Sequence, residues 1–358
     1  MGITRQAVKK KQKRRRRLKV VAFVLLFIIL LIGGYVAYGF YNVYKAAKES
    51  YTPLGRDHSK YRESSVTIGK NPISILLMGV EDYSTGGKNG RTDTLILVTL
   101  NPHTHKMTMT SIPRDTRVPI AGRNGVLDKI NSAYAYGSAS GYGGTRATIE
   151  TVENFLQVPV DYYVKIGFNG FAKAIDEIGG VTVDVPFDFW EKDIFNHNKP
   201  IYFKKGPMHL NGEQALAYVR MRKRDPRGDF GRNDRQRQVI KAAISQAVSA
   251  KTIFKVDELS HIFGKNVETN LKPSDMYALE RAYANISSSN IESIRLDDKG
   301  RGETINGVWY FVPDQAGVAE VTAKIRQELG LSQITDSTTG NENAGQNWNG
   351  SVGTATNP

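Results

Sequence analysis

Cysteine is absent from the chain of 358 residues. This absence excludes disulfide bonds, thiol nucleophiles and zinc sites built on thiolates. Other familiar catalytic patterns are missing too: the sequence has no Gly-x-Ser-x-Gly turn and no Gly-x4-Gly-Lys-Ser/Thr phosphate loop, and its six histidines form no His-Glu-x-x-His pair. Serine hydrolases, nucleotidases and metalloproteases of those types are therefore excluded. The composition suits a protein exported by a bacterium that does not rely on disulfides.

Charged residues are missing from residues 20–44, a run rich in Val, Leu, Ile and Phe. A helix needs about 20 apolar residues to cross a bilayer, so this run is long enough. Residues 1–19 hold ten Lys or Arg and no acid. Without them the net charge falls from +14 to +4, because 39 basic residues remain against 35 acidic ones. The positive charge is therefore local.

The basic cluster next to an apolar run predicts membrane topology and not a nucleic-acid partner. Such clusters stay in the cytoplasm, so we expect a single-pass type II protein of the cell membrane, with a cytoplasmic tail at 1–19, a transmembrane helix at 20–44 and the rest outside. A cleaved signal peptide is the alternative interpretation. Its apolar core is usually shorter, and no clean cleavage site follows Gly34.

The remainder divides into three parts. Residues 45–72 are polar and irregular and predict a stalk between membrane and domain. Residues 73–331 are long enough for one sizeable core in a single domain or for two small domains. Residues 332–358 are rich in Ser, Thr, Gly and Asn with almost no apolar side chains, so a disordered tail is predicted.

Three apolar runs of strand length open the domain. They are Ile73–Val80, Thr94–Thr99 and Met107–Ile112. The break at residues 101–104, Asn-Pro-His-Thr, is a hairpin signal. If the strands pair antiparallel, the end of the first, the start of the second and the end of the third share one edge of the sheet. That edge would bring together Asp82, Asp93 and Arg114.

Helical and strand patterns then alternate. Helices are predicted at Thr145–Leu156, Asn169–Ile178, Glu213–Arg222 (at its start), Asn233–Ala250, Val256–Phe263, Ser274–Ala284 and Gln315–Leu329. Further strands are predicted at Tyr162–Ile166, Val181–Val185 and Ile291–Leu296. This α/β pattern predicts a mixed central sheet with helices on both faces, an α/β/α sandwich, preceded by one transmembrane helix.

Arginine and aspartate are concentrated in two short windows, which define the candidate active site. The first window holds Asp82, Arg91, Asp93, Arg114, Asp115 and Arg117. The second holds Arg220, Arg222, Arg224, Asp225, Arg227, Asp229, Arg232, Asp234 and Arg235. A guanidinium matches phosphate oxygens two at a time, and a carboxylate beside it neutralises it or holds a hard cation. A solvated surface pair is the ordinary interpretation of any one of these arginines taken alone.

Helical spacing favours a buried role for part of the second window. On a helical wheel one arc contains Arg232, Arg235, Gln236, Val239, Ile240, Ala243 and Ala247. The core-facing stripe thus begins with guanidiniums and an amide, near a helix N-terminus that favours an anion. An extended backbone at Tyr218–Arg222 would also place Arg220 and Arg222 on one face.

Each aspartate keeps two interpretations open. Asp82 and Asp93 are turn or cap residues, or they bind magnesium at the strand edge. Asp115 is an ion-pair partner that orients Arg114, or it belongs to the site. Asp229 caps the following helix, or it belongs to the site.

The motifs resemble one known family, in order and with similar spacing. They are Leu76-Leu77-Met78-Gly79-Val80-Glu81-Asp82, Arg91-Thr92-Asp93-Thr94, Ser111-Ile112-Pro113-Arg114-Asp115-Thr116, Lys129-Ile130-Asn131, Gly179-Gly180-Val181, Tyr218-Val219-Arg220-Met221-Arg222 and Gly228-Asp229-Phe230-Gly231-Arg232 through Arg235-Gln236. This set, spanning residues 73–250, resembles the LytR-CpsA-Psr family. The basic tail and single membrane helix are also similar to that family's arrangement.

The resemblance implies a transferase of Gram-positive cell-wall assembly, acting outside the membrane. Such an enzyme moves an anionic glycopolymer (teichoic acid or capsule) from a polyprenyl-pyrophosphate carrier to peptidoglycan through a phosphodiester bond. By this resemblance Asp82 and Asp93 hold Mg²⁺ or Mn²⁺, and the pyrophosphate is bound by Arg114, Arg220, Arg222, Arg232 and Gln236. Arg117 and Arg91 match less closely, and Asp93, Arg114, Arg220 and Arg222 are the expected catalytic residues. The general base is not evident, and Asp93 is our candidate.

Other functions remain compatible with the same residues. A hydrolase would cleave the same pyrophosphate with water as acceptor. A non-enzymatic regulator would bind wall polymer or lipid without transferring it. A transcription factor, as the historical family name suggests, would need a cytoplasmic domain.

Overall fold

The computed structural model describes residues 38, 41–42, 44–81, 90–249, 266–283 and 288–334. Most of the predicted transmembrane helix at 20–44 and of the predicted tail at 332–358 lies outside these residues. The helix predicted at Val256–Phe263 also lies outside them. Within the described ranges, none of the helices combines the length and the apolar character that crossing a membrane requires.

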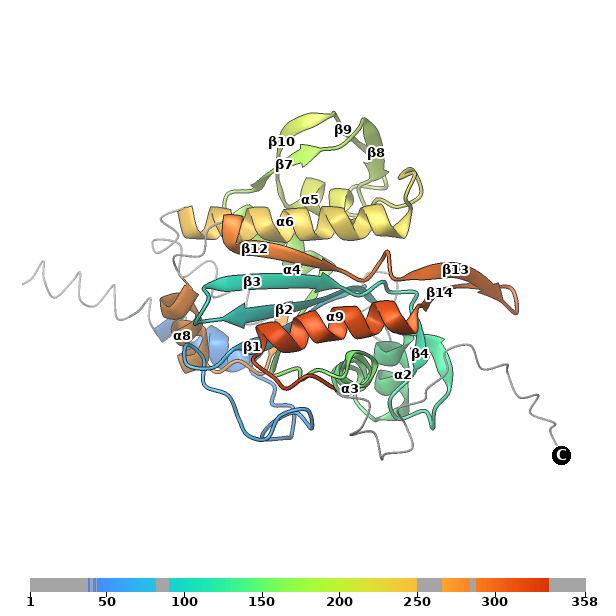
Figure 1. Ribbon diagram of the computed structural model, residues 1–358. Coiled ribbons are helices and arrows are strands. Elements are labelled where there is room, and N and C mark those ends of the chain that lie inside the picture. The colour runs from blue at the N-terminus through green and yellow to red at the C-terminus, as the bar shows by residue number, and fades with distance from the viewer. Residues whose placement is uncertain are drawn as a thin grey trace, which may run out of the picture.

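A six-stranded sheet forms the centre of the molecule, with strand order β11-β6-β1-β2-β3-β12 (Figure 1). Its strands are β1 (Ile73–Val80), β2 (Thr92–Asn101), β3 (Lys106–Ser111), β6 (Tyr162–Gly167), β11 (Val267–Thr269) and β12 (Ile291–Arg295). The first three pair antiparallel, as the predicted meander requires. β6 pairs with β1 in parallel, β12 pairs with β3 in parallel, and β11 pairs with β6 antiparallel. The sheet is therefore mixed.

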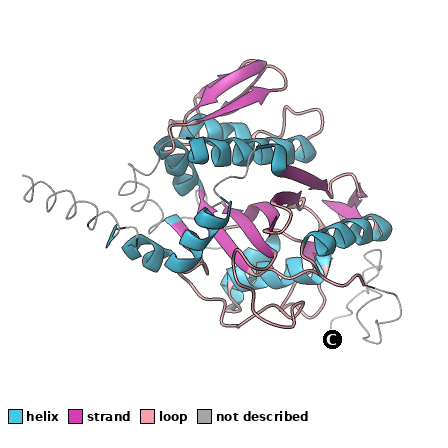
Figure 2. Cartoon of the chain, turned by 60° about the vertical axis from the view of Figure 1, so that its left-hand side comes forward, coloured by secondary structure: helices cyan, strands magenta, loops and turns pink. Residues whose placement is uncertain are grey.

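One face of this sheet is covered by three helices, α2 (Ser132–Ser140), α3 (Gly144–Leu156) and α9 (Gln315–Glu328). Leu76 and Leu97 of the sheet share a buried cluster with Val152 of α3 and Ile325 of α9. The other face is covered by α6 (Asp229–Ser249) and α8 (Pro273–Tyr283). Because both faces are buried, the central strands are nearly continuous apolar runs. The predicted α/β/α sandwich is confirmed for the described residues (Figure 2).

A second core lies beyond α6. It is built from α4 (Phe168–Glu177), α5 (Gly212–Arg220) and two two-stranded sheets, β7 (Val181–Val185) with β10 (Gly206–Leu210) and, between them in the chain, β8 (Phe189–Lys192) with β9 (Pro200–Phe203). Figure 1 shows these two small sheets at the top of the molecule, apart from the central sheet. Val239 of α6 packs into this core, whereas Ile240 packs against the sheet, so α6 separates the two cores.

The polar segment predicted as a stalk is irregular over most of its length, and it is fastened to the domain. Arg56 donates two hydrogen bonds of 2.7 Å to the buried carboxylate of Glu153 on α3. Arg62 donates two to Asp161, at 3.0 and 2.7 Å. Tyr51 forms an isolated bridge with Thr269 beside the end of the sheet. The part of this segment from residue 51 onward is therefore part of the folded unit.

Several short elements escaped prediction. They are α2, β8, β9, β10, β11, the pair β4 (Arg117–Pro119) and β5 (Leu127–Lys129), and the hairpin β13 (Gly300–Ile305) with β14 (Val308–Pro313). The β13–β14 hairpin had a clear sequence signal, the dipeptide Asn306-Gly307. These two residues take the positive φ angles, 50° and 77°, that a two-residue hairpin turn requires. The hairpin matters for the site, because the N–H of Phe311 donates to the carbonyl of Asp115 at 2.9 Å.

Candidate active site at one edge of the sheet

The meander brings Asp93 and Arg114 together, as predicted. Asp93 is the second residue of β2, and Arg114 follows the end of β3 at the same edge. Nη1 of Arg114 donates a hydrogen bond of 2.6 Å to Oδ1 of Asp93. Asp82, the third residue expected here, lies outside the described residues. Its neighbour Glu81 is placed at this edge by a backbone hydrogen bond of 3.0 Å to the carbonyl of Arg91.

Arg114 is surrounded by acids. Its Nε lies 3.6 Å from Oδ2 of Asp115 and 3.7 Å from Oδ1 of Asp229. Burial acts to lower the pKa of Arg114, but the carboxylates of Asp93, Asp115 and Asp229 raise it overall. Arg114 therefore stays charged in a largely buried position.

Asp229 collects arginines from three segments of the chain. It is the first residue of α6, and its side chain is only 8% exposed. Besides Arg114, its Oδ1 lies 2.7 Å from Nη2 of Arg232 and 4.0 Å from Nη1 of Arg222. Burial raises the pKa of Asp229 against the opposing effect of these arginines. The pKa of Arg232 is lowered, mainly by burial.

The ion pairs leave several buried donors unused. Among the described residues, Nε of Arg114 and both Nε and Nη2 of Arg232 are buried without a hydrogen-bond acceptor. Arg232 and Asp229 are close in distance, but their contact lacks hydrogen-bond geometry. Both carboxylate oxygens of Asp229 are therefore also without a donor. Buried polar groups normally find partners. An anion with several oxygen atoms would supply acceptors for these N–H groups.

The segment Tyr218–Arg222 is not extended, so the predicted common face for Arg220 and Arg222 is wrong. α5 continues through Arg220, and the backbone becomes extended only at Met221. The helix persists because Leu216, Tyr218 and Val219 are buried in the second core. As a result the two guanidiniums diverge: Arg220 lies 5.5 Å from the ring of Phe168, and Arg222 faces Asp229.

The helix predicted at Asn233–Ala250 begins earlier than expected. α6 starts at Asp229 and not at Asn233, so Arg232 lies within its first turn. Arg235 is 2% exposed and forms an ion pair with the buried Asp225. It also donates to the carbonyls of Tyr218 (3.1 Å) and Met221. This arginine therefore fixes the loop between α5 and α6.

The remaining predicted residues lie around this centre. Arg117 is buried at the start of β4, with its guanidinium 6.0 Å from the ring of Tyr310. Gln236 is buried one turn after Arg232 on α6, whereas Arg91 is exposed. Sequence reasoning assigned no role to Lys129, whose Nζ lies 2.7 Å from Oδ1 of Asp115. Its place in the Lys-Ile-Asn motif was the available signal.

A metal site is less complete than the arginine cluster. The described residues contain no group of three or more acids or histidines that could hold a metal ion. Of the three aspartates that lie against Arg114 in the described residues, Asp93 has the most exposed carboxylate, and one of its oxygens is bonded to Arg114. Magnesium commonly takes one or two carboxylates together with phosphate oxygens of the substrate. The donor set therefore fits magnesium only when a phosphate and a second carboxylate, such as that of Asp82, complete it.

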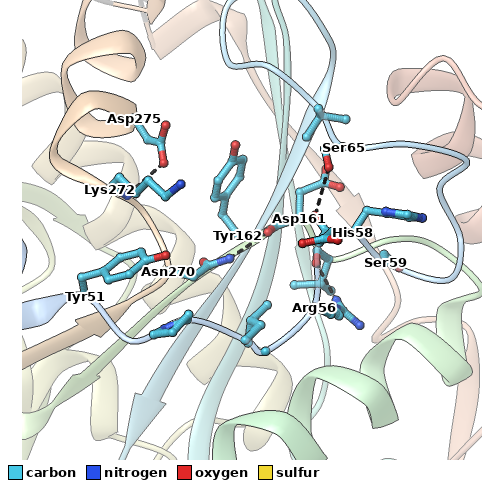
Figure 3. Close-up of a pocket in the computed structure, with 16 residues that line it drawn as sticks. Tyr51, Arg56, His58, Ser59, Ser65, Asp161, Tyr162, Asn270, Lys272 and Asp275 are labelled. Carbon is cyan, nitrogen blue, oxygen red and sulfur yellow. Dashed lines mark hydrogen bonds between the residues drawn. The ribbon is translucent and has the colours of Figure 1, made fainter.

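A cavity of about 630 Å³ lies at the other end of the sheet, between the polar N-terminal segment and the start of α8 (Figure 3). It reaches Tyr162 at the start of β6, whereas the arginine cluster lies where β1 and β6 end. Its charged groups include Arg56 and Asp161, both already held in ion pairs. Burial, with Asp275 and Asp161 nearby, raises the pKa of Tyr162 to about 12. The cavity lacks the concentration of positive charge found at the opposite edge.

Comparison with known proteins agrees with this arrangement. The model of the LytR_cpsA_psr family matches residues 37–327. The chain is 47% identical over 309 residues to the polyisoprenyl-teichoic acid–peptidoglycan teichoic acid transferase TagV of Bacillus subtilis (strain 168), covering 85% of this chain and 78% of that protein. It is 41% identical over 298 residues to the transferase TagU of the same strain, covering 83% and 90%.

Solved structures give the same result. The crystal structure of B. subtilis TagV superposes with a TM-score of 0.64 at 47% identity, covering 74% of this chain and 99% of that one. The structure of TagT bound to LIIa-WTA superposes with a TM-score of 0.65 at 33% identity, covering 78% and 100%.

Proposed function

The chain belongs to the LytR-CpsA-Psr family, and from this membership we propose that it is a transferase that moves teichoic acid from a polyisoprenyl carrier to peptidoglycan. The relatives carry this activity in their names, and the matched region includes the whole arginine cluster. A phosphodiester bond to peptidoglycan, formed from a polyprenyl pyrophosphate, is the finer form of this proposal.

One observation carries the proposal most directly. Arg114 and Arg232 hold buried N–H groups that find no acceptor within the described chain, and Arg222 lies beside them on Asp229. A pyrophosphate diester has the oxygens and the negative charge that these donors lack. Fixed guanidiniums need no reorganisation when more charge develops in the transition state, and this preorganisation is a large contribution to phosphoryl transfer.

The reaction follows from that position. A hydroxyl oxygen of peptidoglycan attacks the phosphorus on the polymer side of the pyrophosphate. The bond from this phosphorus to the bridging oxygen breaks, and polyprenyl phosphate leaves. Arg114, Arg222 and Arg232 stabilise the charge that builds on the leaving oxygens. The hydroxyl proton passes to a carboxylate, and Asp93 is the residue that we propose for this role because it is partly exposed at the site.

Magnesium or manganese is proposed as the cofactor, held by Asp93 and Asp82 together with phosphate oxygens. When bound, the ion would neutralise phosphate charge during transfer. The proposal has support from the hard oxygen ligand that Asp93 offers beside the arginines.

A place outside the cytoplasmic membrane is proposed from the basic residues 1–19 and the apolar run 20–44. A lipid-linked donor stays in the membrane, so an anchored enzyme would remain near it. The apolar slot for the lipid tail is proposed beside α6, on the side of Val239 and Ala243, which faces the second core and not the sheet.

The decisive experiment incubates the full chain with a polyprenyl-pyrophosphate teichoic acid and peptidoglycan glycan strands. A transferase produces the covalent conjugate, whereas a hydrolase releases free polymer and a binding regulator changes neither substrate. Arg232→Gln should abolish the conjugate. Asp184→Asn, which alters an exposed carboxylate of β7, is the control that should retain it. Free polymer without conjugate from the unaltered chain would refute transfer.

A further inference from the structure

Two aromatic side chains lie on the outer face of the β8–β9 hairpin. Trp190 and Tyr202 are directly opposite each other in the antiparallel register. The neighbouring pair, Phe189 and Phe203, is buried in the second core, with ring centroids 4.6 Å apart. Since side chains alternate across a strand, Trp190 and Tyr202 face away from that core. Tyr202 is 65% exposed, although it is a large aromatic residue.

The hairpin contacts the arginine-rich segment that begins with the last residue of α5. The guanidinium carbon of Arg224 lies 3.5 Å from the centroid of the Trp190 ring, and Nη1 of Arg224 lies 3.4 Å from a carboxylate oxygen of Glu191. Arg220 donates to the carbonyl of Lys192 at 3.5 Å. Arg222, between these two arginines in sequence, faces Asp229. The aromatic pair is therefore beside the arginine cluster.

The charge around the aromatic pair is mainly positive on the exposed side. Between residues 187 and 205 the chain has four exposed lysines, namely Lys192, Lys199, Lys204 and Lys205. They stand against three acids, of which Asp193 is buried and Asp188 is paired with Lys204 at 2.8 Å. Arg224 adds a further positive charge next to Trp190. This surface complements a chain that carries phosphates.

We propose that Trp190, Tyr202 and Arg224 form a subsite for the sugar–phosphate chain of the polymer being transferred. The proposal rests on the proposed function and extends it from the pyrophosphate to the polymer attached to it. Aromatic rings provide flat apolar surfaces that match the C–H faces of sugars, and Tyr202 also offers a hydroxyl. Arg224, fixed by Trp190 and Glu191, can donate to sugar hydroxyls or phosphate oxygens. The exposed lysines favour the anionic polymer as the occupant.

A binding experiment tests the subsite without the pyrophosphate. The probe is a synthetic teichoic acid oligomer that has neither lipid nor pyrophosphate, titrated into the full chain. Tyr202→Ala should weaken binding by about tenfold, the upper end of what one aromatic contact contributes. Tyr277→Ala is the matched control, since Tyr277 is also 65% exposed but lies on α8, at the opposite end of the molecule in Figure 1. It should leave binding unchanged.

A kinetic experiment separates the subsite from the proposed function. Two polyprenyl-pyrophosphate donors are compared, one with a long polymer and one with only the first sugar. Tyr202→Ala should raise the KM for the long donor about tenfold relative to that for the short donor. Trp190→Phe, which keeps a ring beside Arg224, should give a smaller change in the same direction.

The outcomes are distinguishable. If the unaltered chain transfers from neither donor, the proposed function fails. If it transfers from both and Tyr202→Ala changes neither KM, the subsite alone is wrong. If peptidoglycan glycan strands, and not the teichoic acid oligomer, lose affinity in Tyr202→Ala, the surface binds the acceptor, and the inference is overturned.

Discussion

Asp229 and Arg232 lie one turn apart at the start of α6, with 2.7 Å between Oδ1 and Nη2, and both side chains are at most 8% exposed. An isolated pair of this kind would be costly to desolvate. Here the carboxylate is also approached by Arg114 and Arg222, so one buried negative charge faces three guanidiniums. Asp93 and Asp115 also approach Arg114, so what an anionic substrate would add is acceptors for the unused N–H groups of Arg114 and Arg232.

Replacing the shared carboxylate should loosen the arginine cluster. Asp229→Asn keeps the shape of the side chain but removes its charge, so we expect transferase activity to fall by about a hundredfold or more, the scale of losing one preorganised electrostatic group. The melting temperature should fall as well, because the buried arginines lose their counter-charge. Inorganic pyrophosphate should restore part of that loss, as measured by thermal unfolding with and without the anion. A melting temperature that pyrophosphate leaves unchanged would count against a phosphate site.

Arg235 should prove structural. Arg235→Gln leaves the carboxylate of Asp225 buried and unpaired, which we expect to cost about 3–5 kcal/mol of unfolding free energy. Urea denaturation measures this loss. Arg227→Gln is the matched control, because Arg227 is 52% exposed in its pair with Asp234 and should change stability by about 1 kcal/mol or less. Equal effects of the two variants would contradict the assignment.

Metal removal should stop transfer. We expect a chelator to abolish activity and added Mg²⁺ or Mn²⁺ to restore it. The phosphates need positive charge in addition to that of the arginines, and a metal ion bound by Asp93 would supply it. Asp93→Asn should require a higher metal concentration for half-maximal activity, and its rate at saturating metal should stay low because an amide cannot accept the hydroxyl proton. Asp298→Asn, which alters a carboxylate 52% exposed in the loop before β13, should behave as the unaltered chain. Full activity in the presence of chelator would remove the metal from the mechanism.

The N-terminal polar segment should contribute to stability. Glu153 is 1% exposed and bonded to Arg56, so Glu153→Gln should lower the unfolding free energy by about 3 kcal/mol. A chain that starts at residue 73 should be less stable than one that starts at residue 45. Equal urea midpoints for these two chains would mean that the segment serves only as a spacer.

Topology is testable with a reporter. A reporter fused after Leu331 should be active outside the cytoplasm, since residues 1–19 are basic and residues 20–44 apolar. A fusion active only inside the cell would mean that the domain is cytoplasmic, as the transcription-factor interpretation requires.

Five of the six strands of the central sheet were predictable because their signal is local, whereas β11, with three residues, was not predicted. β1 was predicted with its observed bounds, and the other predicted strands lie within two residues of the observed ones. Burial on both faces makes β1 and most of β2 apolar runs, and burial on one face gives β7 its alternating pattern, so the sequence displays both directly. The short pairs β8–β9 and β4–β5 were not predictable in this way, because a strand of three or four residues gains its regularity from its partner.

The contacts of the site were also predictable only where local strand order determines them. Asp93 and Arg114 could be brought together in advance, since an antiparallel meander fixes which strand ends share an edge. Asp229 was left between a cap and a site residue, and Arg235 could not be told from Arg232. These two arginines are three residues apart on one helix face, yet one pairs with Asp229 and the other with Asp225.

The sequence by itself determined the α/β/α class, the arginine-rich motifs and the edge at which the meander gathers them. Only the tertiary structure decided which guanidinium faces which carboxylate, and that Arg220 and Arg222 diverge. The physical reason is the distance along the chain between the residues that interact. Strand and helix patterns arise from neighbours in sequence, whereas an ion pair depends on where separate segments pack. A side chain's charge can be read from the sequence, but its partner is chosen by the fold.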